Sequence, residues 1–229
     1  MIDCFLRFHF VFILLNVFRK KSKSIKVRMD SKKGQIVQAA LKRFSHYGFN
    51  KTTMSEIAVD LNITKANLYY YYPDKNALIK DVLACISDEI LTKQYEVLDQ
   101  YDGSLVKVLC KLLKIKADFL KDYYVLHINE NLEWIKGQGI GTLLEKFHYK
   151  NIEIVGNLLK RAVEYGEIEV CSTEEAATSY TEIMAGLSLI RSVSDTISGM
   201  PNARNVDDIL ESQEKATKFI FNNKIKEKN

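Results

Sequence analysis

The residues best suited to chemistry lie in one short segment, residues 53–75, and the chemistry they suit is contact with a nucleic acid. Thr53 and Thr64 are good helix N-caps, and Asn62 between them tolerates the left-handed backbone of a tight turn, so two short helices joined by a turn are expected. Polar side chains on the second helix can then reach base edges and phosphates. The side chains predicted to bind DNA are Thr53, Thr64, Lys65, Ala66, Asn67, Tyr69, Tyr70 and Lys75.

Two roles are expected within this set. Residues 64–67 are predicted to read base edges, because the start of the second helix of a helix-turn-helix enters the major groove. Tyr69, Tyr70 and Lys75 are better placed to hold phosphates, and Lys75 also lies near the positive end of the following helix. The alternative for the run of four tyrosines is core packing, which we expect for Tyr72 above all.

Aromatic side chains and histidines form a second group between residues 119 and 149. Aromatic rings with a few polar groups suit a pocket for a small molecule between helices. Plain core packing is the alternative, since the same helical spacing would serve it equally well. The residues predicted to bind an unknown small-molecule effector are Tyr123, Tyr124, His127, Trp134 and Phe147.

No pattern for catalysis or metal binding is recognisable. The chain has no nucleophile elbow, no H-E-x-x-H and no phosphate-binding glycine loop ahead of Lys-Ser/Thr. Four cysteines and four histidines are scattered without ligand spacing or a triad. We therefore predict no catalytic residues, no metal and no cofactor, with free thiols in a reducing cytoplasm.

Helices are the elements expected to position these residues. The 229 residues are 47% hydrophobic and 27% charged, with only ten glycines and two prolines, which disfavours turn-rich β folds and long disorder. Apolar periodicity and capping signals predict helices over about 31–47, 53–61, 64–72, 75–100, 104–121, 124–136, 142–165, 172–198 and 206–226. The first three would form a helix-turn-helix.

Charge is distributed unevenly along the chain. Residues 1–28 carry seven basic and one acidic residue, residues 29–75 carry seven and four, and residues 76–229 carry nineteen and twenty-four. A basic first third ahead of an acidic remainder fits an anion-binding module joined to a body that binds a ligand or a partner.

The first 28 residues fit neither a signal peptide nor a membrane span. Their apolar run is short and interrupted, Asp3 precedes it, and the positive charges follow it. We expect residues 1–28 to be a wrongly included or disordered leader ahead of a start at Met29. Residues 29–76 are then predicted to be the helix-turn-helix DNA-binding domain, and residues 77–229 a helical ligand-binding and dimerisation domain.

Residues 53–79 resemble the helix-turn-helix of the TetR family of bacterial transcriptional regulators. They read T-M-S-E-I-A-V-D-L-N-I-T-K-A-N-L-Y-Y-Y-Y-P-D-K-N-A-L-I, with the family's capping Thr, Ile-Ala pair, Leu-Tyr with further aromatics, and the Lys and Leu that open a fourth helix. The upstream residues that match the family's first helix and its glycine are Ala39, Ala40, Phe44, Gly48 and Phe49. The departures are Asn62, where the family usually has Gly, and Ala66 with Asn67, where small or hydroxyl residues are usual.

The resemblance implies an all-α protein in which an N-terminal three-helix helix-turn-helix DNA-binding domain precedes a larger helical ligand-binding and dimerisation domain. It further implies a cytoplasmic homodimer that binds double-stranded DNA at a palindromic operator and acts as a ligand-responsive repressor, with no enzymatic activity and no membrane partner. Two alternatives stay open. One is a helical ligand-binding enzyme with an incidental helix-turn-helix, and the other is a DNA-binding protein tethered to a membrane through residues 2–18.

The last two predicted helices carry apolar stripes that must be buried against something. Apolar residues between 176 and 190 alternate spacings of four and three, as in a coiled-coil seam, and the final helix adds a second stripe. By the resemblance, these helices would form a four-helix bundle with their copies in a second subunit, and burial within one chain is the alternative. The residues predicted at the dimer interface are Tyr180, Ile183, Leu187, Ile190, Ile209 and Phe219.

Overall fold

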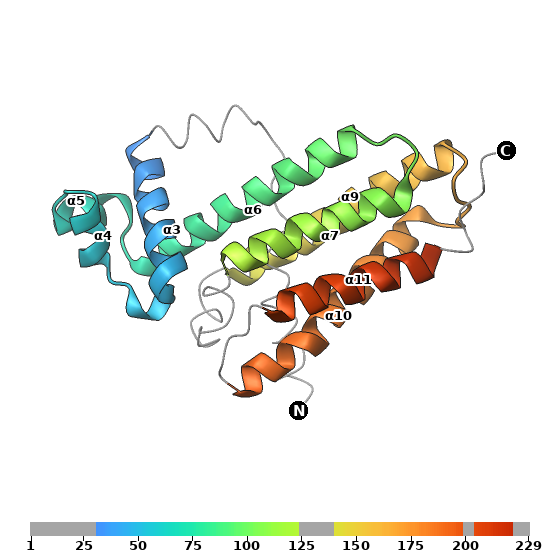
Figure 1. The fold of residues 1–229 in the computed structure, drawn as a ribbon. Coiled ribbons are helices and arrows are strands. Elements are labelled where there is room, and N and C mark those ends of the chain that lie inside the picture. Colours follow the sequence, from blue (N-terminus) through green and yellow to red (C-terminus); the bar gives the residue numbers. More distant parts are fainter. Residues whose placement is uncertain (1–30, 124–139, 199–203, 222–229) are drawn as a thin grey trace.

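A computed structural model describes residues 31–123, 140–198 and 204–221, and every regular element in these ranges is an α-helix (Figure 1). The helices are α3 (Lys32–Lys51), α4 (Met54–Asp60), α5 (Lys65–Tyr71), α6 (Lys75–Asp99), α7 (Leu105–Asp122), α9 (Ile140–Glu164), α10 (Thr173–Ser198) and α11 (Arg204–Phe221). The predicted all-α fold is confirmed, and each helix within the described ranges begins and ends within a few residues of its predicted bounds. The leader at residues 1–28 and the helix expected over 124–136 lie outside the described residues.

Local signals account for these helix boundaries. Ser31 accepts a hydrogen bond from the Gly34 amide at 3.1 Å and so caps α3, and Asp74 accepts one from the Ala77 amide at 2.8 Å and caps α6. Gly48 has a φ of 80°, a left-handed conformation that glycine adopts without strain, and the backbone of α3 kinks there before a final turn that ends at Lys51.

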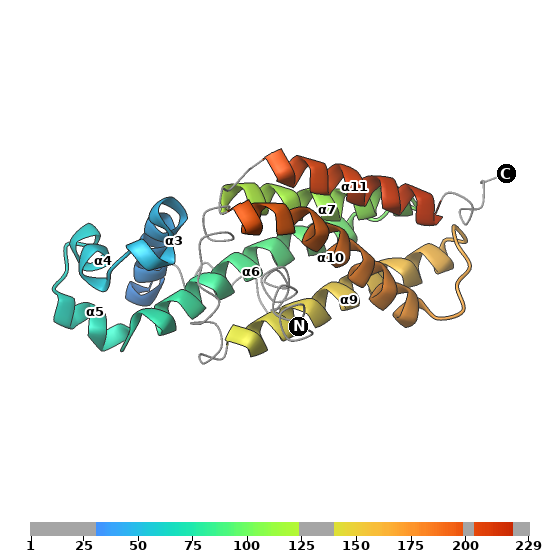
Figure 2. The same ribbon diagram turned by 90° about the horizontal axis from the view of Figure 1, so that it is seen from below.

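The helices form a small head and a larger body joined by one long helix. Helices α3, α4 and α5 lie at one end of the molecule, and α6 runs from this head along the body, as two perpendicular views show (Figures 1 and 2). Helices α7, α9, α10 and α11 make up the rest of the body, and α10 and α11 lie side by side in both views.

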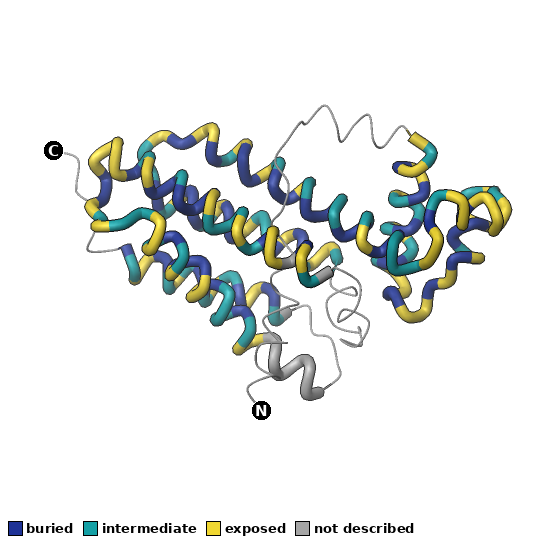
Figure 3. The backbone as a smooth tube through the Cα atoms, turned by 180° about the vertical axis from the view of Figure 1, so that it is seen from behind, coloured by how far each residue is buried: buried dark blue, intermediate teal, exposed yellow. Residues whose placement is uncertain are grey.

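Two apolar clusters hold these parts together. The first joins the head to the beginning of α6 through residues such as Phe44, Ile57, Leu68 and Leu78. The second joins the end of α6 to the other body helices. The buried positions follow one stripe along each body helix, as an amphipathic helix requires (Figure 3). Helix α6 contributes to both clusters and so connects the packing of the head with that of the body.

A buried carboxylate caps α7 from a distant part of the chain. Ser104, at the N-cap position, makes no side-chain capping bond. Glu167 supplies the missing acceptor, because its carboxylate accepts from the Leu105 amide at 2.9 Å and from the Tyr101 hydroxyl at 2.5 Å. Burial, followed by the contact with Glu167, raises the pKa of Tyr101, so this hydroxyl remains a donor.

Candidate nucleic-acid interface

A tight turn joins α4 to α5 and sets the direction of α5. Asn62 has a φ of 51°, the left-handed conformation expected for it, and its amide donates to the Val59 carbonyl at 3.0 Å. The Ile63 amide then donates to the Ala58 carbonyl at 3.0 Å. Thr64 caps α5 by accepting from the Asn67 amide at 3.1 Å. The helix-turn-helix predicted from the sequence is therefore present.

Helix α5 is buried along one edge only. Leu68 is fully buried, and Tyr72 just beyond the helix is 2% exposed, with its hydroxyl donating to Asp81 at 2.9 Å. The predicted core role of Tyr72 is confirmed. The side chains that face solvent are Thr64, Lys65, Ala66, Asn67, Tyr69 and Tyr70.

This exposed face combines charge, amide and phenol groups. Tyr70 is 85% exposed, so most of this aromatic side chain is in contact with solvent. The Lys65 ammonium lies 5.8 Å from the centre of the Tyr69 ring, one helical turn away, so the two side chains approach each other. Donors on a protruding helix of this kind can reach base edges and phosphates of a duplex.

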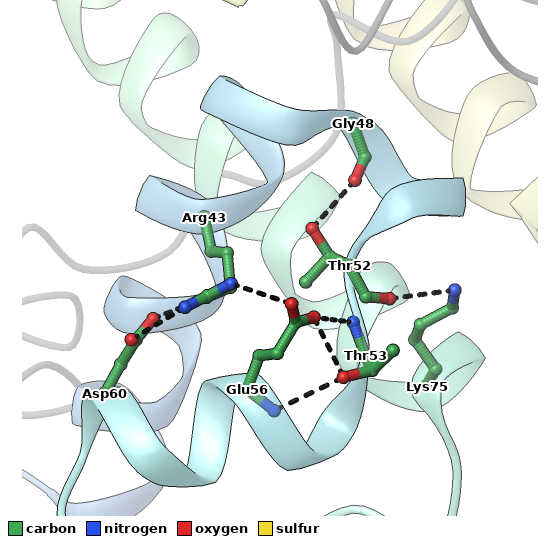
Figure 4. Close-up of polar contacts among 7 residues, drawn as sticks. All are labelled: Arg43, Gly48, Thr52, Thr53, Glu56, Asp60 and Lys75. Atoms are coloured by element: carbon green, nitrogen blue, oxygen red, sulfur yellow. Dashed lines mark hydrogen bonds and ion pairs between the residues drawn. The ribbon is translucent and has the colours of Figure 1, made fainter.

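A polar network joins α4 to α3 (Figure 4). Arg43 donates two parallel hydrogen bonds to Asp60, from Nε at 2.6 Å and from Nη2 at 2.9 Å, and its Nη1 lies 3.3 Å from Glu56. The hydrogen bond between them raises the pKa of Arg43 and lowers the pKa of Asp60. The network thus orients α4, on which the turn and α5 depend.

Thr53 belongs to the same network, as a complete capping box. Its hydroxyl accepts from the Glu56 amide at 3.3 Å and donates to the Glu56 carboxylate at 2.8 Å, and its own amide donates to that carboxylate at 2.7 Å. These bonds with the backbone and hydroxyl of Thr53 lower the pKa of Glu56. The sequence predicted a DNA contact by Thr53. Its two donors, the amide and the hydroxyl, both donate to Glu56 in the capping box, so a phosphate contact would have to share or replace one of these bonds.

Lys75 lies half-buried at the start of α6 and points back to the end of α3. Its ammonium donates to the carbonyl of Phe49 at 2.9 Å. It also donates to the carbonyl of Thr52 at 3.2 Å (Figure 4). An ammonium has three N–H groups, so one remains available for a phosphate. The sequence predicted only the phosphate role, and the bracing role of Lys75 had no sequence signal.

The predicted effector residues are not brought together within the described ranges. Tyr124, His127 and Trp134 lie outside these ranges. Tyr123 is half-buried with its ring centre 6.0 Å from that of Phe119, and Phe147 is fully buried. The described residues form a pocket between α7, α9 and α10, and its lining includes neither Tyr123 nor Phe147.

The residues predicted at the dimer interface differ in burial. Tyr180 and Ile209 are buried inside the chain, and the Tyr180 hydroxyl lies 2.7 Å from that of Thr217 on α11, so burial within one chain accounts for them. Leu187 is half-buried. The exposed members are Ile183, Ile190 and Phe219, of which Phe219 is 86% exposed.

The fold and this interface define an all-α protein with an N-terminal helix-turn-helix. Residues 36–82 match the family model described as bacterial regulatory proteins, tetR family. The match covers the helix-turn-helix head and the start of α6. None of the helices formed by the described residues is long and apolar enough to cross a bilayer.

Two transcriptional regulators are similar to this chain over part of its length. Over 104 residues, 45% of the chain, it is 32% identical to the HTH-type transcriptional regulator RutR of Escherichia coli, of which it covers 46%. Over 56 residues, 24% of the chain, it is 36% identical to the biofilm operon icaADBC HTH-type negative transcriptional regulator IcaR of Staphylococcus aureus, of which it covers 30%. The chain thus spans less than half the length of either relative.

The similarity of the fold extends further. The crystal structure of a transcriptional regulator from Cytophaga hutchinsonii superposes with a TM-score of 0.77 at 25% identity, covering 86% of this chain and 99% of that one. The body of this protein therefore has the same fold as that of the Cytophaga hutchinsonii regulator. The relatives found by sequence match less than half of this chain.

Proposed function

We propose that this protein is a DNA-binding transcriptional regulator that acts as a cytoplasmic homodimer on a palindromic operator, most simply as a repressor. The observation that carries the proposal is the exposed face of α5, where Lys65, Asn67 and Tyr70 project from a helix anchored by the buried Leu68. A helix presented in this way fits the major groove. IcaR of Staphylococcus aureus, to which the chain is similar, is a negative transcriptional regulator, and this supports repression.

Homodimer formation is supported by the exposed apolar side chains of the last two helices. Three large apolar side chains are exposed on these two adjacent helices: Ile183 and Ile190 on α10 and Phe219 on α11. Exposed apolar side chains of this kind favour burial in an interface with another protein. A two-fold pairing through these helices would present two heads to the DNA, and operator symmetry mirrors such protein symmetry.

Response to a ligand would act through α6. Gln94, which lines the body pocket, lies 19 residues along the same helix from Lys75, or about 29 Å at the rise of an α-helix. Lys75 is bonded to the end of α3, so a ligand that favours one position of α6 changes the placement of the head. The effect on DNA binding equals the ligand's difference in affinity for the two arrangements.

Selection of bound duplexes from a random pool tests the proposal. We expect enrichment of a palindromic sequence whose half-sites are about one helical turn of DNA apart, or a multiple of it. Recovery of no enriched sequence, with binding that is equal for all duplexes, would contradict the assignment of a sequence-specific regulator.

A further inference from the structure

The body contains a pocket that is partly open to solvent. It lies mainly between α7, α9 and α10, with one residue each from α6 and α11. Much of its wall is apolar, including Leu113, Ile154 and Met184, and none of its described lining residues is acidic. A pocket with these walls suits the apolar body of a small molecule.

Two polar side chains in this wall have buried groups without partners. Gln94 is fully buried, and within the described part of the chain neither its amide oxygen nor its amide nitrogen has a hydrogen-bond partner. The Thr181 hydroxyl is likewise buried and without a partner there. An unsatisfied buried polar group is costly, so such groups call for an explanation such as a bound molecule.

A second buried amide in the same wall provides an internal comparison. Gln213 on α11 donates from Nε2 to the Met184 carbonyl at 2.9 Å and to the Ser188 hydroxyl at 2.8 Å. The same surroundings can therefore satisfy a glutamine. The unpaired amide of Gln94 is specific to its position in the pocket.

The wall of the pocket also includes a cation. Lys116 on α7 lines the pocket and has no carboxylate partner among the described residues, whereas Lys114 on the same helix pairs with Asp118. Burial lowers the pKa of Lys116 to about 8, which leaves it mainly charged at neutral pH. A charged, desolvated ammonium beside apolar walls favours an anionic partner.

We infer that this pocket binds a small organic monocarboxylate as the effector of the proposed regulator. Its carboxylate would pair with Lys116, the side chains of Gln94 and Thr181 would hydrogen-bond to its polar end, and its apolar body would lie against Leu113 and Ile154. One cation with apolar walls fits a single carboxylate better than a phosphate dianion, which needs more donors. The regulatory role of this ligand rests on the proposed function, whereas its binding to the pocket does not.

The test is calorimetric titration of the whole protein with straight-chain carboxylates from butanoate to decanoate. We expect at least one, such as octanoate, to bind, and 1-octanol and octylamine to bind about tenfold more weakly or not at all. Lys116→Met should weaken octanoate by about tenfold or more, and Gln94→Leu should weaken it by about fivefold. Lys111→Met, at an exposed lysine on the same helix, should leave binding within about twofold.

Three results would overturn the inference. They are the absence of binding by every carboxylate up to about 1 mM, equal binding of octanol and octanoate, and unchanged affinity in Lys116→Met. If Lys116→Met does not fold, the octanoate affinities of Gln94→Leu and Thr181→Ala serve as the test, and unchanged affinity in both would overturn the inference. DNA binding without added carboxylate is measured on the same preparation. Because the two measurements are independent, a protein that binds DNA but no carboxylate would contradict only the ligand assignment, and one that binds carboxylate but no DNA would contradict only the proposed function.

Discussion

The ammonium of Lys75 donates a hydrogen bond to the carbonyl oxygen of Thr52 at 3.2 Å, and so connects the first turn of α6 to the residue just before the cap of α4. The same ammonium holds Phe49 at the end of α3. One side chain therefore joins the helix that passes into the body to the two helices that support α5. A residue predicted from the sequence to touch phosphate is also a brace for the head.

Lys75→Ala should reduce both stability and DNA affinity. Loss of two hydrogen bonds from a charged donor is expected to lower the free energy of unfolding by about 1–2 kcal/mol. Loss of its phosphate contact should weaken binding to every duplex alike and reduce the steepness of the salt dependence by about one per head. Thermal melting and gel shifts at several salt concentrations measure these effects. Lys80→Ala, at an exposed lysine on the same helix, is the control, and equal effects in both variants would contradict the brace.

Arg43→Met should loosen α4 on α3. The partners Asp60 and Glu56 are both more than a third exposed, so the loss in stability is expected to be only about 0.5 kcal/mol. The pKa of Asp60 is below its ordinary value of 3.8 in the folded state, so its stabilising contribution is present at neutral pH and is lost as the pH falls through the folded-state pKa. Acid unfolding of the variant should therefore depend less on pH. Identical acid unfolding curves would show that the pair contributes nothing.

Lys116→Met should stabilise the protein in the absence of a ligand. The pKa of Lys116 is about 8 in the folded protein against an ordinary value of 10.5, so the unfolded chain binds more protons between these values and stability should rise with pH across that window. Removing the ammonium should raise the free energy of unfolding at pH 7 by about 1–3 kcal/mol and abolish that rise. The other ionisable side chains in the pocket wall are His148 and Tyr180, and burial raises the pKa of Tyr180. Denaturant unfolding at pH 7 and pH 10 measures the free energy of unfolding of the variant and the wild type. A variant that is less stable than the wild type at pH 7 would contradict the conclusion that the Lys116 ammonium is desolvated.

Ile190→Glu should convert a dimer to a folded monomer. Ile190 is 71% exposed, so the charge is tolerated in a single chain, whereas an unpaired carboxylate buried in an interface is costly. Light scattering should give half the wild-type mass with unchanged helix content. Tyr149→Glu, at a similarly exposed position on α9, should remain dimeric. A dimer in both variants would move the interface away from α10.

Helix positions in this protein follow from local sequence signals. The caps at Thr53 and Thr64 and the left-handed residues Gly48 and Asn62 act within a few residues of themselves, so they could be identified without a structure. The exposed face of α5 followed from the period of the helix, because Leu68 and Tyr72 had to point together into the head.

Contacts between distant segments could not be predicted in this way. Glu167 caps α7 at Leu105, 62 residues earlier, and no local pattern marks such a pair. The apolar stripe of α10 gave no means to separate Tyr180, which packs inside the chain, from Ile190, which does not. The polar wall formed by Gln94 and Lys116 comes from two helices, and a glutamine or lysine within a helix normally indicates only a solvated face.

We propose above all that α5 reads the DNA sequence. The most direct test measures the binding of Lys65→Ala, Asn67→Ala and the wild type to the selected operator and to its single-base variants. Each substitution should cost about 1–3 kcal/mol of binding free energy and relax the base preference at one symmetric pair of positions. Lys75→Ala should weaken all of these duplexes equally. If Lys65→Ala and Asn67→Ala leave both affinity and base preference unchanged, α5 is not the reading helix and the account is wrong.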